Sequence, residues 1–107
     1  MKEFCLIVEG SFKSVEEAKH ALIDPFIEDY VAKTGKYKIH NAEVIRVASG
    51  IALNDLSIAQ VEDGVFEISC KDSPQVMNRR RAEQLAEELT RQAIFDEISV
   101  VELDNPL

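Results

Sequence analysis

The stretch that decides the fold reads LSIAQVEDGVFEISC, residues 56–70. Apolar and polar residues alternate on both sides of Asp63-Gly64, a pair typical of a two-residue hairpin turn. The pattern predicts two antiparallel strands, Leu56–Glu62 and Val65–Cys70, joined by a type I′ turn. Such a turn sets a register whose facing pairs form an apolar surface: Val61 with Phe66, Ala59 with Ile68, and Ser57 with Cys70.

On the N-terminal side of the hairpin, residues 3–9 are apolar on both alternating faces, which predicts an interior strand. Ser14 and Glu17 have the spacing of a capping box, so a helix is expected to begin there. Pro25 interrupts its apolar stripe and predicts a kink, or a break followed by a second helical piece to Lys33. Gly35 is suited to end this segment, because glycine readily takes the left-handed conformation.

Three further elements complete the chain. Glu43–Ala48 is the best candidate for a strand between the first helix and the hairpin. After the hairpin, Asp72 or Ser73 is expected to cap a second helix with Pro74 in its first turn. Its apolar stripe is expected to lie against the sheet: Ala82, Leu85, Ala86, Leu89 and Ala93. Residues 97–103 form the last strand.

The predicted order is β-α-β-β-β-α-β, within a single α+β domain over residues 1–107. It resembles the ferredoxin-like order with one extra strand: a two-layer sandwich with two main helices on one face of a mostly antiparallel sheet. This is a resemblance to an architecture and to no particular family. Many unrelated functions use this architecture, so function has to be argued from a site.

Composition limits the function classes. Twelve Lys and Arg against twenty Asp and Glu give a net charge of −8, which argues against binding of free nucleic acid. The second half is the acidic one: residues 54–107 hold twelve acids and five bases. No apolar run is long enough to span a bilayer or serve as a signal peptide, so we expect a cytoplasmic protein without membrane contact.

The sequence contains no motif that names a reaction. Cys5 and Cys70 are expected to be buried, reduced thiols, with a disulfide as the less favoured alternative. Together with His20 and His40 they lack the spacing of zinc ligands, and phosphate-binding glycine loops and nucleophile–base motifs are missing. We therefore expect no catalytic residue, no cofactor, no metal and no enzymatic activity.

One hypothesis concerns an anion site. If the first strand and Val65–Cys70 ran parallel, the loops that follow them would emerge at the same edge and bring two helix N-termini together. Backbone N–H groups at helix N-termini bind phosphate or carboxylate groups. The residues that would join them are Ser11, Lys13, Ser14, Lys71 and Ser73. The alternative is ordinary helix capping beside two solvated lysines.

A second hypothesis concerns the sheet face opposite the helices. Ile7, Ile58 and Val65 are expected there, which makes that face too apolar to be fully solvated. Either a second copy or another protein covers it, or the segment Tyr37–Asn54 folds across it. Acidic residues around the hairpin would border such an interface: Glu62, Asp63 and Glu67.

The leading functional hypothesis is a small acidic non-enzymatic protein-binding module, an adaptor, regulator or inhibitor acting through a sheet face or edge. The expected partner is another protein with a basic surface, and in a narrower version the module blocks a nucleic-acid-binding surface. A homodimer is also expected. The alternative is a sensor of small anionic ligands, or a minor enzyme, that uses the helix N-termini near Lys13 and Lys71.

Overall fold

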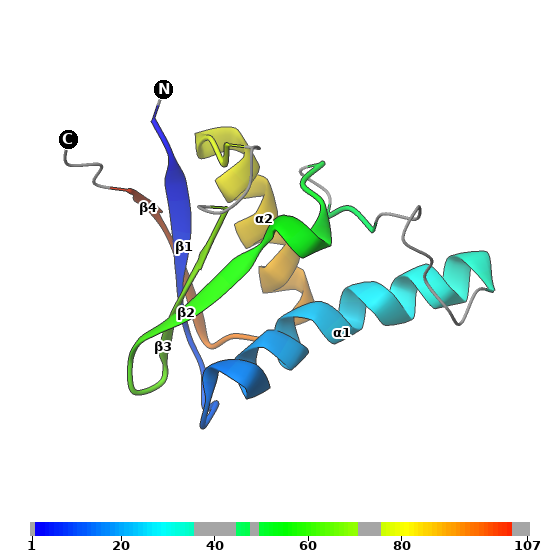
Figure 1. The fold of residues 1–107 in the computed structure, drawn as a ribbon, viewed down its shortest axis with the longest axis horizontal. Coiled ribbons are helices and arrows are strands. Elements are labelled where there is room, and N and C mark those ends of the chain that lie inside the picture. Colours follow the sequence, from blue (N-terminus) through cyan, green and yellow to red (C-terminus); the bar gives the residue numbers. More distant parts are fainter. Residues whose placement is uncertain (1, 36–44, 48–49, 71–75, 104–107) are drawn as a thin grey trace.

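The computed structural model describes residues 2–35, 45–47, 50–70 and 76–103. These residues form an α+β fold with a four-stranded antiparallel sheet and two α-helices (Figure 1). The elements in chain order are β1 (Phe4–Glu9), α1 (Val15–Thr34), the short 3-10 helix η1 (Leu53–Asp55), β2 (Ser57–Glu62), β3 (Val65–Ser69), α2 (Arg79–Gln92) and β4 (Glu97–Glu102). No helix among these residues is both long and apolar enough to cross a membrane.

The sheet has the strand order β2-β3-β1-β4, and every neighbouring pair is antiparallel. The prediction of an interior strand at β1 is confirmed, since β1 lies between two strands and Leu6 and Val8 are fully buried. The parallel pairing of β1 with β3 is wrong. Because the two strands run in opposite directions, the end of β1 meets the start of β3, and the Gly10 N–H donates to the Gly64 carbonyl at 2.9 Å.

The core lies between the sheet and the two helices. Alternate residues of the two central strands, among them Leu6 and Phe66, point to this side. They belong to one buried cluster with apolar residues of both helices: Ala18, Leu22 and Phe26 of α1, and Ala82, Leu85 and Leu89 of α2. Both helices therefore pack on one face of the sheet, called here the inner face, and the opposite face is called the outer face.

The β2–β3 hairpin is confirmed, but its turn type and register differ from the prediction. Of the two turn residues only Gly64 has a positive φ, 73°, whereas a type I′ turn needs two. The ladder shifts between Gln60 and Glu62, where β2 carries one extra residue, a β-bulge. Ile58 consequently faces Ile68, in place of the predicted Ala59. A shift of one residue turns every β2 side chain upstream of the bulge to the other face.

Helix α1 begins as predicted and continues past its proline. The Glu17 N–H donates to Ser14 Oγ at 3.2 Å, and the Glu17 carboxylate accepts from the Lys13 N–H at 3.4 Å. Of the two alternatives predicted at Pro25, a kink or a break, the break is wrong, because a single helix runs from Val15 to Thr34. Gly35 ends the helix in the left-handed region, with φ 71°, as predicted.

The segment before β2 packs on the helix side of the sheet. The predicted strand at Glu43–Ala48 is reduced, over its described residues, to one bridge between Arg46 and Ala52. Buried apolar side chains of this segment join the core cluster: Val47, Ile51, Leu53 and Leu56. The described part of Tyr37–Asn54 therefore does not fold across the outer face.

Helix α2 begins later than predicted. Asn78 caps it, with its side-chain oxygen accepting from the Arg81 N–H at 2.9 Å, and the first helical residue is Arg79. The preceding Met77 is held outside the helix because its carbonyl accepts from the Phe4 N–H at 2.8 Å. The predicted caps, Asp72 and Ser73, lie outside the described residues.

Candidate functional site

The outer face of the sheet is the surface that neither helix covers. The strand register assigns its members, which alternate with the core residues along each strand. They are Cys5, Ile7 and Glu9 of β1, Ser57, Ala59 and Glu62 of β2, Val65, Glu67 and Ser69 of β3, and Glu97, Ser99 and Val101 of β4. Val101 is 41% exposed and Ile7 and Val65 are half-buried, so apolar surface is present among the carboxylates. Cys5 and Ser69 are buried, at 2% and 3% exposed, and offer no surface to a partner.

One cross-strand row of the outer face is acidic. Glu62 pairs with Val65, Val65 with Glu9, and Glu9 with Glu97, so the row crosses all four strands. Neighbouring strands lie about 4.8 Å apart, which places the carboxylates of Glu9 and Glu97 side by side. This set, Glu62, Glu9 and Glu97, is called the acidic row.

The carboxylates of the acidic row interact with one another. A hydrogen bond that the protonated Glu9 side chain donates to Glu97, together with the negative charge of Glu97, raises the pKa of Glu9 above its ordinary range. Desolvation, Glu62 and Asp96 contribute less. Two neighbouring carboxylates hold a proton more strongly than either does alone, because ionising both places like charges together. The row therefore carries an electrostatic strain that a nearby cation would relieve.

None of the four strands that the structure describes carries a basic residue to offset these charges. The four strands contain five glutamates and neither lysine nor arginine. An ion pair at the sheet margin, Lys2 with Glu102 at 3.7 Å, involves the far end of β4 and is largely exposed, so it contributes little. The sheet is thus the negative layer of the molecule.

Most of the predicted interface residues do share one surface. Ile7, Val65, Glu62 and Glu67 all lie on the outer face. Asp63 is exposed in the hairpin turn at its border. The prediction for Ile58 is wrong, because the bulge turns this residue to the inner face, where it packs against the core.

The two helix N-termini that were predicted to converge on an anion site lie far apart in the structure. The N-terminus of α1 follows the last residue of β1, whereas Met77, just before α2, bonds to Phe4 at the first residue of β1. The two helix N-termini are thus separated by the length of a six-residue strand, about 20 Å. Ser14 serves as a helix cap, and Ser11 and Lys13 are exposed. Lys71 and Ser73 lie outside the described residues.

The arginine run at 79–81 has a structural role. The Arg79 guanidinium lies 5.1 Å from the centre of the Phe4 ring, and Arg81 Nη1 donates to the Val76 carbonyl at 2.9 Å. The first contact holds the start of α2 against the beginning of β1, and the second ties α2 to the segment just before it. The sequence gives no local signal for the position of the Arg79 guanidinium over the Phe4 ring.

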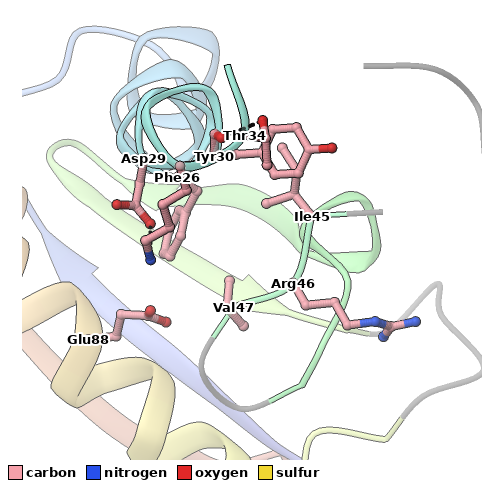
Figure 2. Close-up of a pocket in the computed structure, with 9 residues that line it drawn as sticks. Phe26, Asp29, Tyr30, Thr34, Ile45, Arg46, Val47 and Glu88 are labelled. Carbon is pink, nitrogen blue, oxygen red and sulfur yellow. Dashed lines mark hydrogen bonds and ion pairs between the residues drawn. The ribbon is translucent and has the colours of Figure 1, made fainter. Parts of the chain in front are cut away.

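A hollow of about 420 Å³ lies between the second half of α1, the segment Ile45–Val47 and α2 (Figure 2). Its charged side chains already have partners: Asp29 pairs with Lys33 at 2.9 Å, and Arg46 points away and donates to the Gly50 carbonyl at 2.8 Å. Within the described ranges, no three or more histidine, cysteine or acidic residues come together as metal ligands do. No arrangement of nucleophile and base is seen in this hollow.

Comparisons with protein-family models, with curated proteins and with solved structures found no match. The candidate site therefore rests on its own geometry, and the outer face with its acidic row is the surface with the most distinctive chemistry.

Proposed function

We propose that this protein is a small non-enzymatic protein-binding module whose outer face binds a partner with a basic surface. The observation that carries the proposal is the acidic row, three glutamates in register on a sheet face that neither of the two described helices covers. We also infer a ferredoxin-like arrangement, which is supported by two strand–helix–strand units interleaved in one antiparallel sheet.

Charge complementarity supports a basic partner. A lysine or arginine placed between Glu9 and Glu97 would offset the repulsion between these carboxylates and would form charge-assisted hydrogen bonds with them. The apolar side chains of Ile7 and Val65 lie within the same face and would add buried area. Electrostatic complementarity of this kind raises association rates and selects partners.

A narrower form of the proposal makes the partner surface one that otherwise binds nucleic acid. The carboxylates would then occupy positions that phosphates take, and the partner would be inhibited. This form predicts that DNA or RNA competes with the module for its partner, and that binding weakens steeply with salt.

A homodimer through the outer face fits this charge pattern poorly. A two-fold interface brings the same patch of both copies together. The acidic rows would then oppose each other, and like charges in contact oppose association. We therefore propose a different protein as the partner on this face.

The test compares two variants with the same change in net charge. The face variant carries Glu9→Gln, Glu62→Gln and Glu97→Gln, and the control carries Glu28→Gln, Glu83→Gln and Glu87→Gln on the helices. Each is immobilised with the wild type, incubated with lysate of the native source, and eluted in salt steps with quantification by mass spectrometry. Circular dichroism verifies that both variants fold.

The proposal expects one protein that the wild type and the control retain equally and the face variant loses at about tenfold lower salt. Equal retention by all three, or retention of nothing by the wild type, would refute it. Competition by added DNA with the retained protein separates the narrower form from the general one.

A further inference from the structure

Strand β2 lies at one edge of the sheet, and no other strand in the described part of the chain pairs with its outer side. Every second residue of an edge strand directs its N–H and C=O groups away from the sheet, where another strand can pair with them. Proteins usually protect such edges with charges, prolines or bulges. Here the bulge and Glu62 protect only the hairpin end, while Ile58–Gln60 carries neither charge nor proline.

A hollow of about 470 Å³ lies beside this unprotected stretch, called here the β2 groove. The first two turns of α1 form one wall and the start of β2 forms the other. The lining residues are Val15, Glu16, Lys19, Asn54, Leu56, Ser57 and Ile58. Ile58 and Val15 are both half-buried, so an apolar side chain entering the groove would gain contact on two sides.

We propose that the β2 edge binds an extended peptide segment of a partner protein as an added strand, with one aliphatic side chain in the β2 groove and a lysine or arginine opposite Glu62. The combination of an exposed strand edge and a flanking pocket is the geometry of strand addition, in which main-chain hydrogen bonds give affinity and the pocket gives specificity. This inference goes beyond the proposed function, because it uses the edge of the sheet and shares only Glu62 with the outer face.

The register gives the spacing of the two side chains in the peptide. Ile58 pairs with Ile68 and Glu62 pairs with Val65, so the bulge compresses four steps on β2 into three on β3, from 68 to 65. A regular added strand follows the three-step spacing, about 10 Å. In an extended peptide, residues three positions apart point to opposite faces of the sheet. This matches β2, where Ile58 lies on the inner face and Glu62 on the outer face.

Charge favours the basic residue at the hairpin end. In the groove Lys19 stands near Glu16, so this region is close to neutral. At the other end of β2, Glu62 is followed by Asp63, and both are exposed. A cation in the peptide therefore matches the hairpin end, and an uncharged aliphatic side chain matches the groove.

The first experiment titrates the protein into a fluorescent peptide, Lys-Thr-Thr-Ile-Thr-Thr-Lys, which has a basic residue three positions from isoleucine in either strand direction. Two control peptides replace the isoleucine by glycine or carry backbone N-methyl groups on every second residue. We expect saturable binding below ~1 mM and at least about tenfold weaker binding of both controls. Absence of binding by the first peptide, or equal binding of the N-methylated one, would overturn the proposal.

The second experiment locates the site with charge variants on the two edge strands. Glu62→Lys is expected to weaken binding about tenfold, whereas Glu102→Lys on β4 leaves it unchanged. Amide chemical shifts are expected to change on peptide addition at Ser57–Gln60 and in the first two turns of α1. Equal effects of the two variants would overturn the proposal, as would dimerisation of the chain through Ser57–Gln60 in place of peptide binding. The Glu9 and Glu97 charges are intact throughout, so failure here leaves the proposal for the outer face standing.

Discussion

Replacing Gly10 by alanine is predicted to destabilise the protein through a clash with one aromatic ring. An ideal Cβ at position 10 would lie 2.6 Å and 2.9 Å from two ring carbons of Phe12. Carbon atoms in ordinary contact are 3.5–4.0 Å apart, so the ring would have to move by about 1 Å. Phe12 packs edge-on against Phe66 and Phe95, with ring centres 6.2 Å and 5.6 Å away, and cannot move without disturbing both contacts.

The magnitude follows from these contacts. Overpacking of this kind costs about 1–3 kcal/mol, and each aromatic pair contributes about 0.5–1.5 kcal/mol. We therefore expect Gly10→Ala to lower the free energy of unfolding by about 2 kcal/mol. For a domain of this size that corresponds to a fall in Tm of about 10 °C. Urea and thermal unfolding followed by circular dichroism measure both quantities.

A double-mutant cycle separates the clash from other effects of the added methyl group. In a Phe12→Leu background the obstructing ring is gone, so Gly10→Ala should cost about 0.5 kcal/mol or less. Gly35→Ala is a contrasting control: its Cβ would meet nothing within 4 Å, and its cost comes only from the positive φ of 71°. An equal cost of Gly10→Ala in both backgrounds would refute the clash, as would a cost below about 0.5 kcal/mol in the wild type.

Three further predictions concern other parts of the chain. Burial, with a smaller effect of Asp55, raises the pKa of Cys70 to about 11. The Cys70 thiol should therefore react with a thiol reagent at pH 8 only after denaturant is added. Rapid labelling of Cys70 in the native protein would contradict this prediction. Glu97→Gln should raise the free energy of unfolding at pH 7, because the pKa of Glu9 is raised in the folded state and stability therefore falls as pH rises through that pKa. This increase in the free energy of unfolding, measured by urea titration, should become smaller at pH values below the ordinary glutamate pKa. An increase that does not depend on pH would contradict the repulsion between Glu9 and Glu97. Asn78→Ala removes the cap of α2 and should cost about 1 kcal/mol, measured by urea unfolding.

The fold class followed from the sequence because its signals were local. The alternation around Asp63-Gly64, the capping box at Ser14 and the all-apolar pattern of β1 each predicted an element that the structure contains. The antiparallel direction of β1 relative to β3 could also have been predicted from the sequence. A helical crossover makes β1 and β2 parallel, and a hairpin makes β2 and β3 antiparallel, so β3 beside β1 must be antiparallel.

The details that were wrong depend on signals that the sequence does not carry locally. A left-handed glycine serves both a type I′ turn and a bulged turn, so Asp63-Gly64 did not distinguish the two registers. The register of the hairpin decides which face of the sheet Ile58 lies on. The prediction that Ile58 belongs to the interface was therefore wrong together with the register. The start of α2 depended on the bond from Phe4 to Met77, which joins residues far apart in the chain. The acidic row was missed as a set, because its members are neighbours only through the strand register.

The distribution of glutamates over the four strands bears on how the protein behaves at high concentration. Both edges of the sheet end in carboxylates, Glu62 on β2 and Glu97 and Glu102 on β4. Two copies that approach through β4, or through the hairpin end of β2, therefore meet like charges before their backbones can pair, which opposes growth of stacked, fibril-like sheets. This protection depends on ionisation. It should weaken as the pH approaches the isoelectric point of about 4.7, where turbidity is expected to rise first.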